Sequence, residues 1–168
     1  MVWSHPSSDR RNGEQPVELS ELLRPEHVFL DIPARTREEV LVYVAQHLEQ
    51  VGAVRRSQDL VDLLLDRERL GATLVGEETA IPHCRVPGLG SVIAAFARSP
   101  EPVPFGFDEG LARLFFFILS PHEQPAAHLH VLANIARLLG DPQVRSVFEG
   151  ATNAAALTSA LSEAEARP

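Results

Sequence analysis

Residues 111–119 read Leu-Ala-Arg-Leu-Phe-Phe-Phe-Ile-Leu, and this run decides the fold. Its apolar side chains do not alternate with polar ones, so both faces of a strand built from them must be covered by other elements. The run has the length of a strand and is far shorter than the roughly 20 residues that a membrane-spanning helix needs. We therefore predict a central strand here, buried on both sides.

Strand and helix patterns alternate on either side of this strand. A second buried strand is expected at 91–98, a strand-like segment at 27–32 and a short extended piece at 73–75. Loops are expected at 76–83 and in the Pro-rich segment 100–106. Helices are expected at 36–51, 57–69 and 125–139, with two shorter ones opened by Asp141-Pro142 and Asn153. Such alternation predicts an α/β domain with helices on both faces of one sheet, but not its strand order.

Composition limits the function classes. The chain has 168 residues and a net charge of −8, which favours one domain and argues against nucleic acid or an anionic membrane surface as the main partner. Its single cysteine excludes an internal disulfide. Residues 1–16 are expected to be a disordered tail without a signal peptide, and 17–168 the folded domain. We expect a cytoplasmic protein without direct membrane insertion.

Two basic residues occupy the apolar stripes of predicted helices. Arg67 continues the stripe of Leu63 and Leu64, and His128 precedes Val131 and Leu132 by three and four positions. A buried basic group is costly unless it has an anionic partner. Either residue alone has an ordinary alternative, which is a snorkelling guanidinium or a core-edge imidazole bonded to a carbonyl.

His83 completes the candidate site. It follows Pro82, which fixes its own φ and favours an extended conformation at Ile81, so the backbone before His83 is stiff. Alone it is an ordinary loop histidine. Together with Arg67 and His128, it suggests one site for one anion, and a phosphoryl group suits an Arg fork and imidazole nitrogens.

A family resemblance lies in this same region. Residues 64–73, Leu-Leu-Asp-Arg-Glu-Arg-Leu-Gly-Ala-Thr, followed by Ala-Ile-Pro-His at 80–83, resemble the signature of fructose/mannitol-type (type 2) enzyme IIA domains of the bacterial phosphoenolpyruvate-dependent sugar phosphotransferase system. That family includes nitrogen-regulatory IIA proteins. Residues 128–132 match its later His-Leu-x-x-Leu element, and the resemblance extends from about residue 17 to the last helix.

The resemblance implies a three-layer α/β sandwich with a mixed sheet and a phosphocarrier or regulatory function. His83 would accept a phosphoryl group from an HPr-type carrier protein and pass it to a IIB partner, or signal to a regulated target. Arg67 and His128 would surround the phosphohistidine, with no metal or cofactor. Sugar transport and nitrogen regulation both remain open, and we favour regulation because these 168 residues hold no IIB or IIC region.

Three residues near His83 depart from the family pattern. Glu77 and Glu78 replace a glycine-rich turn and are expected to repel a phosphoryl group, and Cys84 stands where glycine is usual. Glu77 and Glu78 raise the alternative of a degenerate, non-phosphorylated binding module. A Cys–His hydrolase or transferase built on Cys84 and a zinc site from His83, His122 and His128 are further alternatives, although neither has the expected motif or ligand spacing.

Overall fold

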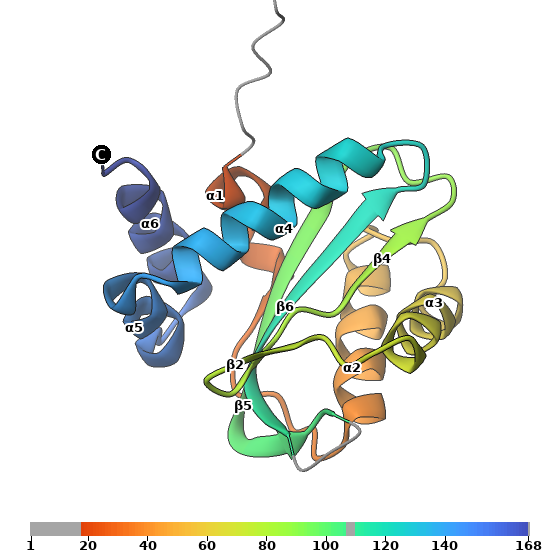
Figure 1. Ribbon diagram of the computed structural model, residues 1–168, viewed down its shortest axis with the longest axis horizontal. Coiled ribbons are helices and arrows are strands. Elements are labelled where there is room, and N and C mark those ends of the chain that lie inside the picture. Colours follow the sequence, from red (N-terminus) through yellow and green to blue (C-terminus); the bar gives the residue numbers. More distant parts are fainter. Residues whose placement is uncertain (1–17, 107–109, 168) are drawn as a thin grey trace, which may run out of the picture.

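The computed structural model describes residues 18–106 and 110–167, and it forms a three-layer α/β sandwich around a mixed six-stranded sheet (Figure 1). The expected tail at 1–16 lies outside the described residues. The predicted fold class is confirmed. The elements in chain order are α1 (Leu19–Leu22), a 3-10 turn (Pro25–His27), β1 (Val28–Phe29), α2 (Arg37–Gln50), α3 (Ser57–Arg69), β2 (Leu74–Gly76), β3 (Thr79–Ala80), β4 (His83–Val86), β5 (Ile93–Pro104), β6 (Leu111–Pro121), α4 (Pro125–Leu139), α5 (Pro142–Gly150) and α6 (Ala154–Glu165).

Strand β6 is central, as its sequence predicts. It pairs antiparallel with β5 and parallel with both β3 and β4, while β1 lies parallel on the far side of β5 and β2 closes the other edge. Strands β3 and β4 keep one register against β6, with Thr79 opposite Leu114 and His83 opposite Ile118. Residues 79–86 therefore lie along β6 almost as one extended strand.

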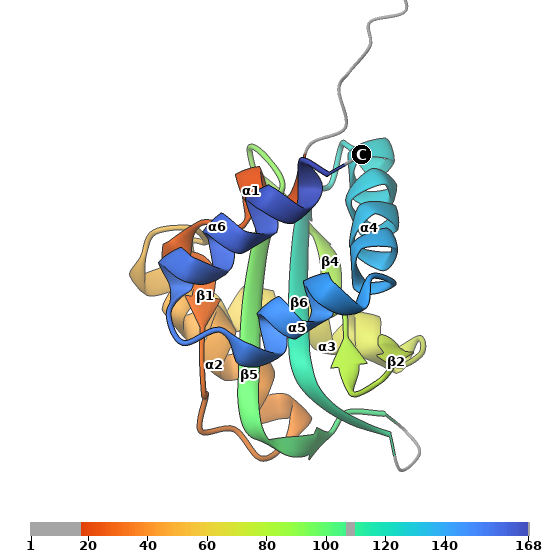
Figure 2. The ribbon, with the colours of Figure 1, turned by 90° about the vertical axis from the view of Figure 1, so that its left-hand side faces the viewer.

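Side chains of β6 alternate between two hydrophobic cores. Phe115, Phe117 and Leu119 pack beneath α2 and α3, whereas Leu114, Phe116 and Ile118 pack beneath α1, α4, α5 and α6. Figure 2 looks onto the second of these faces, with α6 and α5 in front of the sheet. Because both faces are covered, the uninterrupted apolar run of β6 is fully explained.

Most predicted helix starts are confirmed. Thr36, Asp141 and Asn153 each accept a backbone hydrogen bond in the first turn of α2, α5 and α6. Helix α3 differs, because its N-cap residue Arg56 makes no side-chain cap and the helix begins at Ser57. The N–H of Ser57 donates instead to Glu49 Oε2 of α2, at 2.8 Å. A tertiary contact thus supplies the cap.

Other boundaries also differ from the sequence expectations. Strand β5 runs to Pro104 through the expected 100–106 connection, with a register irregularity between Arg98 and Val103. Prolines are tolerated at this irregularity because the hydrogen-bond ladder between β5 and β6 is already interrupted. The expected 76–83 loop contains β3 and the first residue of β4, since both pair with β6. Only Val28–Phe29 of the segment 27–32 is strand.

Within the described residues, no helix is both long and apolar enough to cross a bilayer.

Candidate functional site

His83 is the first residue of β4, and both of its ring nitrogens have partners. Nδ1 lies 2.7 Å from the carbonyl oxygen of Ile81, which can only accept, so Nδ1 carries the hydrogen. Nε2 lies 3.3 Å from Nε of Arg67, which can only donate, so Nε2 holds the free electron pair. The two contacts define one neutral tautomer with an unprotonated Nε2.

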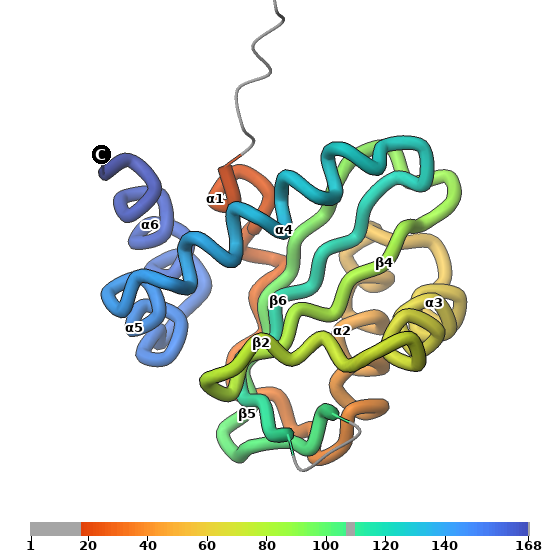
Figure 3. The backbone as a smooth tube through the Cα atoms, in the orientation of Figure 1, coloured from red at the N-terminus to blue at the C-terminus, as the bar shows by residue number. Residues whose placement is uncertain are grey.

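Arg67 reaches His83 from the last turn of α3, which lies beside β4 (Figure 3). Its side chain is half-buried, at the edge of the apolar stripe. Nη1 donates to the carbonyl oxygen of Gly71 at 3.0 Å. Gly71 has φ 152°, a conformation that other residues rarely adopt, so it lets the chain turn back toward the guanidinium. The Arg67 guanidinium is therefore held by two hydrogen bonds, from Nε to His83 and from Nη1 to Gly71.

His128 approaches from the first turn of α4. Its ring centroid lies 5.2 Å from that of His83, and its Nδ1 lies 2.7 Å from Oγ of Ser120 in β6. The buried residues of α4 are Val131, Ile135 and Leu138, whereas Leu132 is only half-buried. The structure thus brings together the three residues that the sequence singled out.

The electrostatics of this site favour an anion. Burial lowers the pKa of His83, and the Arg67 charge lowers it further, against an opposing hydrogen bond to Ile81. Burial lowers the pKa of His128 to about 4, with contributions from His83, Arg85 and Arg67. Both imidazoles are therefore neutral at pH 7, while the Arg67 guanidinium keeps its charge. The site combines a free nucleophilic nitrogen with a fixed cation.

The low pKa of His128 makes stability depend on pH. The unfolded chain, with an ordinary pKa of 6.5, binds this proton more readily than the folded protein, so stability falls as pH drops from 6.5 toward 4. We expect a loss of about 1 kcal/mol between pH 7.5 and pH 5 from this half-exposed group. Urea unfolding of the wild type and of His128→Gln will measure it. The His128→Gln variant should lose part of the pH dependence of the free energy of unfolding. His130→Gln, on the surface, is the control and should keep it. An unchanged pH dependence in His128→Gln would contradict its assignment to His128.

Glu68 is a buried residue of this region that the sequence analysis missed. Its side chain is 0% exposed, and it accepts from the backbone N–H of Thr73 at 3.2 Å and from Thr73 Oγ1 at 2.5 Å. These bonds close the turn that follows α3 and carries Gly71. Its position eight residues after Leu60 and four after Leu64 was the available signal, because that spacing repeats the helical stripe.

Removing this carboxylate should destabilise the protein. Glu68→Ala leaves two Thr73 donors buried without an acceptor, and we expect a loss of about 2 kcal/mol in the free energy of unfolding. Urea denaturation measures it. Asp62→Ala, on the exposed face of the same helix, is the control and should change stability by about 0.5 kcal/mol or less. Equal effects of the two substitutions would contradict a structural role for Glu68.

Cys84 is not placed for nucleophilic chemistry. It packs in the core beneath α2 and α3, and burial raises the pKa of its thiol to about 12. The thiolate that reactions require is therefore nearly absent at pH 7, which argues against the Cys–His hydrolase. Across the described parts of the chain, no group of three or more His, Cys, Asp or Glu side chains is arranged to hold a metal ion.

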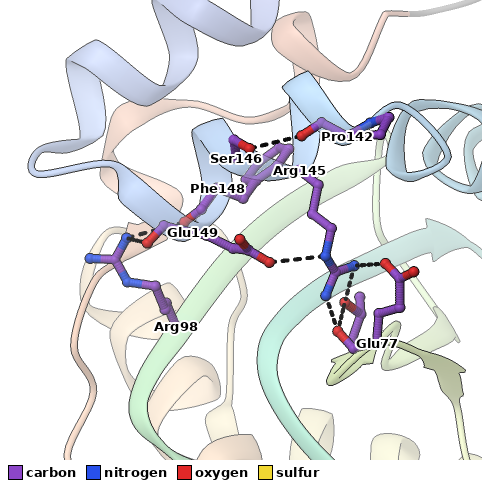
Figure 4. A network of polar contacts seen from close by, with 8 residues as sticks. Glu77, Arg98, Pro142, Arg145, Ser146, Phe148 and Glu149 are labelled. Atoms are coloured by element: carbon purple, nitrogen blue, oxygen red, sulfur yellow. Dashed lines mark hydrogen bonds and ion pairs between the residues drawn. The ribbon is translucent and has the colours of Figure 1, made fainter.

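The acidic turn between β2 and β3 is held away from His83. Glu77 is 76% exposed and pairs with Nη1 of Arg145 in α5 at 3.3 Å, while Nη2 of Arg145 also binds the Glu77 carbonyl oxygen (Figure 4). Arg145 Nη1 donates to Thr79 Oγ1 as well, at 3.1 Å. Three residues lie between Thr79 and His83, and the four extended steps that join them span roughly 13 Å, so the turn before Thr79 is at least about that far from His83. The expected repulsion of a phosphoryl group is therefore weak.

Comparison with known proteins gives this geometry its context. Residues 21–164 match the family described as the phosphoenolpyruvate-dependent sugar phosphotransferase system, EIIA 2. The chain belongs to this family. A nitrogen regulatory protein of Bradyrhizobium diazoefficiens is 31% identical over 144 residues, which are 85% of this chain and 94% of that protein.

Solved structures of EIIA proteins share the fold. The nitrogen regulatory protein IIA-Ntr from Neisseria meningitidis superposes with a TM-score of 0.76 at 29% identity, over 84% of this chain and 97% of that one. Enzyme IIA of the Escherichia coli mannitol system, in complex with phosphorylated enzyme IIB, gives a TM-score of 0.69 at 27% identity, covering 84% and 99% of the two chains. Membership of the EIIA family supports a phosphocarrier or regulatory role for this chain.

Proposed function

We propose that this EIIA protein accepts a phosphoryl group on Nε2 of His83. The observation that carries the proposal is the pair of hydrogen bonds that leave Nε2 as the unprotonated nitrogen, with the Arg67 guanidinium beside it. A neutral imidazole with a free electron pair is a competent nucleophile at pH 7. Because the Ile81 carbonyl holds the Nδ1 hydrogen, the tautomer is set before the donor arrives.

The transfer balances without moving a proton. The electron pair of His83 Nε2 forms the new P–N bond, and the P–N bond of the donor phosphohistidine breaks. The donor ring carries a hydrogen on its other nitrogen, so it takes back the electron pair and leaves as a neutral imidazole, while its positive ring charge passes to His83. The Nδ1 hydrogen stays on His83, bound to the Ile81 carbonyl. Such a transfer depends on positioning and charge stabilisation more than on acid–base chemistry.

Arg67 and His128 would stabilise the transferred group. The Arg67 fork donates to Nε2 over a long 3.3 Å contact, which is weak enough to be exchanged for the phosphoryl oxygens. Its second anchor on Gly71 keeps the charge in place during that exchange. His128 lies next to the acceptor ring, with the two ring centroids 5.2 Å apart, and supplies a neutral contact.

The phosphoryl donor would be an HPr-type carrier protein, and the recipient a IIB component or a regulated target in the cytoplasm. Two large apolar side chains next to the site support docking of a protein. Leu70, which follows α3, is 84% exposed, and Leu129, next to His128, is 67% exposed. The nitrogen regulatory proteins among the relatives support the regulatory role over sugar transport.

Reconstituted transfer tests the function. The protein is incubated with phosphoenolpyruvate, enzyme I and an HPr-type carrier, and intact mass spectrometry should show an acid-labile gain of one phosphate. Omitting the carrier should prevent the gain. Pull-downs of the phosphorylated and unphosphorylated protein would then separate the roles. A second partner that depends on phosphorylation supports regulation, whereas transfer to IIB alone supports transport. No mass gain would contradict the proposed function.

The degenerate binding module is the second candidate, and Glu77 and Glu78 are the residues that favour it. At roughly 13 Å through water, one carboxylate costs a phosphoryl charge about 0.3 kcal/mol, which changes the rate less than twofold. We therefore expect Glu77→Gln and Glu78→Gln to be phosphorylated at nearly the wild-type rate. Quenched-flow or timed mass measurements provide the test. A large gain in rate would mean that these carboxylates suppress the site.

A further inference from the structure

Ser120 contacts His128 from the protein interior, and it has no role in the transfer proposed above. It lies in β6, in register with Arg85 of β4, and its side chain is 0% exposed. Its Oγ lies 2.7 Å from Nδ1 of His128. Strand β6 and helix α4 pack together, so this contact holds the imidazole from the core side.

Burial decides which atom donates in this contact. A serine hydroxyl has one hydrogen to donate and electron pairs to accept, and a neutral imidazole Nδ1 can do either. Among the described residues, Ser120 Oγ has no other hydrogen-bond partner. A buried hydrogen without an acceptor is more costly than an unused electron pair. Ser120 therefore donates, and Nδ1 of His128 accepts.

The hydrogen of the His128 ring must then be on Nε2. The ring is neutral, because burial and the charges of His83, Arg85 and Arg67 lower the pKa of His128 to about 4. A neutral imidazole carries one hydrogen, and Nδ1 is already an acceptor. The two histidines consequently have opposite tautomers, with their ring centroids 5.2 Å apart. His83 has a bare Nε2, and His128 has an Nε2–H.

We propose that Ser120 is a positioning residue that fixes His128 as the Nε2–H tautomer, so that this hydrogen is donated to the phosphoryl group on His83. The donation rests on the proposed function, whereas the tautomer does not. A neutral donor suits a carrier, because it strengthens its hydrogen bond as negative charge gathers on the oxygens without adding a second full positive charge. The phosphohistidine thus stays able to pass its group on.

The tautomer is tested in the unmodified wild-type protein. Long-range proton–nitrogen NMR at pH 7 separates protonated from unprotonated ring nitrogens. We expect His128 with hydrogen on Nε2 and none on Nδ1, and His83 with the reverse. A His128 ring protonated on Nδ1 overturns the proposal, whatever the protein does with phosphate.

Variants test the consequence for transfer. Ser120→Ala should populate both His128 tautomers and lower the phosphorylation rate roughly three- to tenfold. Ser120→Thr, which keeps the hydroxyl, should restore the single wild-type tautomer and the wild-type rate. Ser99→Ala is the matched control, because Ser99 is another fully buried serine whose hydroxyl donates to a backbone carbonyl, that of Glu101. It should leave the tautomer and rate unchanged.

The position of the donor nitrogen can be tested separately. His128→Gln places an amide N–H near the Nε2 position and should transfer faster than His128→Asn, whose amide reaches only the Nδ1 position. The reverse order, or a Ser120→Ala protein with wild-type tautomer and rate, overturns the proposal. If the wild type gains no phosphate, the proposed function and the donation fail together, and the NMR spectrum still decides the tautomer.

Discussion

His83→Ala should gain no phosphate under conditions in which the wild type gains one. Nε2 of His83 is the imidazole nitrogen that combines a free electron pair with an adjacent guanidinium. His128 does not substitute for it, because its Nδ1 is bound by Ser120. Removing the acceptor therefore removes the covalent product, which is the largest effect that one substitution can have here. Intact mass spectrometry after incubation with phosphoenolpyruvate, enzyme I and an HPr-type carrier measures it.

The matched control for this substitution is His130→Ala. His130 lies on α4 close to His128, but its side chain is exposed. It should be phosphorylated at the wild-type rate. A phosphate on the His83→Ala protein, or loss of the phosphate in the His130→Ala protein, would contradict the assignment of the acceptor. Unfolding by urea should confirm that both variants are folded.

Arg67→Met should slow phosphorylation of His83 by roughly a hundredfold. Two unit charges about 5 Å apart at an effective dielectric constant of 20 interact by about 3 kcal/mol, and losing this stabilisation in the transition state gives that factor. Methionine keeps an unbranched stem for packing and removes the charge. Timed mass measurements with a fixed concentration of phosphorylated carrier give the rate constant.

Two further variants show that the effect belongs to the fork of Arg67. Arg67→Lys keeps a charge but cannot hold Gly71 and the acceptor site together, so its rate should lie between those of Met and Arg. Arg69→Met is the control, because Arg69 is 70% exposed and pairs with Asp66 on the surface. It should transfer at the wild-type rate. Equal losses in the Arg67 and Arg69 variants would point to general charge attraction of the carrier instead.

Local sequence signals predicted the elements well where one periodicity dominates. The helix at 125–139 has the predicted bounds, because Pro125 suits a first turn and the apolar stripe is regular. The signals were weaker where pairing overrides local preference. Strand β5 passes through the Pro-rich segment, and β3 and β4 are strands because their backbones pair with β6.

The candidate residues were also recognisable from the sequence. Arg67 and His128 stood out as basic residues in apolar stripes, and His83 through its motif. Glu68 was overlooked, although it lies on the same stripe as Leu64, because nothing local indicates that Thr73 will satisfy its carboxylate. The acidic turn was expected to oppose phosphorylation because its partner, Arg145, lies far along the chain.

The sequence by itself determined the α/β class, the buried central strand, the main helices and the residue types of the site, because these depend on periodicity and on chemistry along a short stretch. Only the tertiary structure decided the strand order, the cap that Glu49 supplies to α3 and the pairing of Arg145 with Glu77. It also brought Arg67 of α3 and His128 of α4 to the ring of His83 in β4. These three side chains meet because separate elements pack together, and no single stretch of sequence contains those packing contacts.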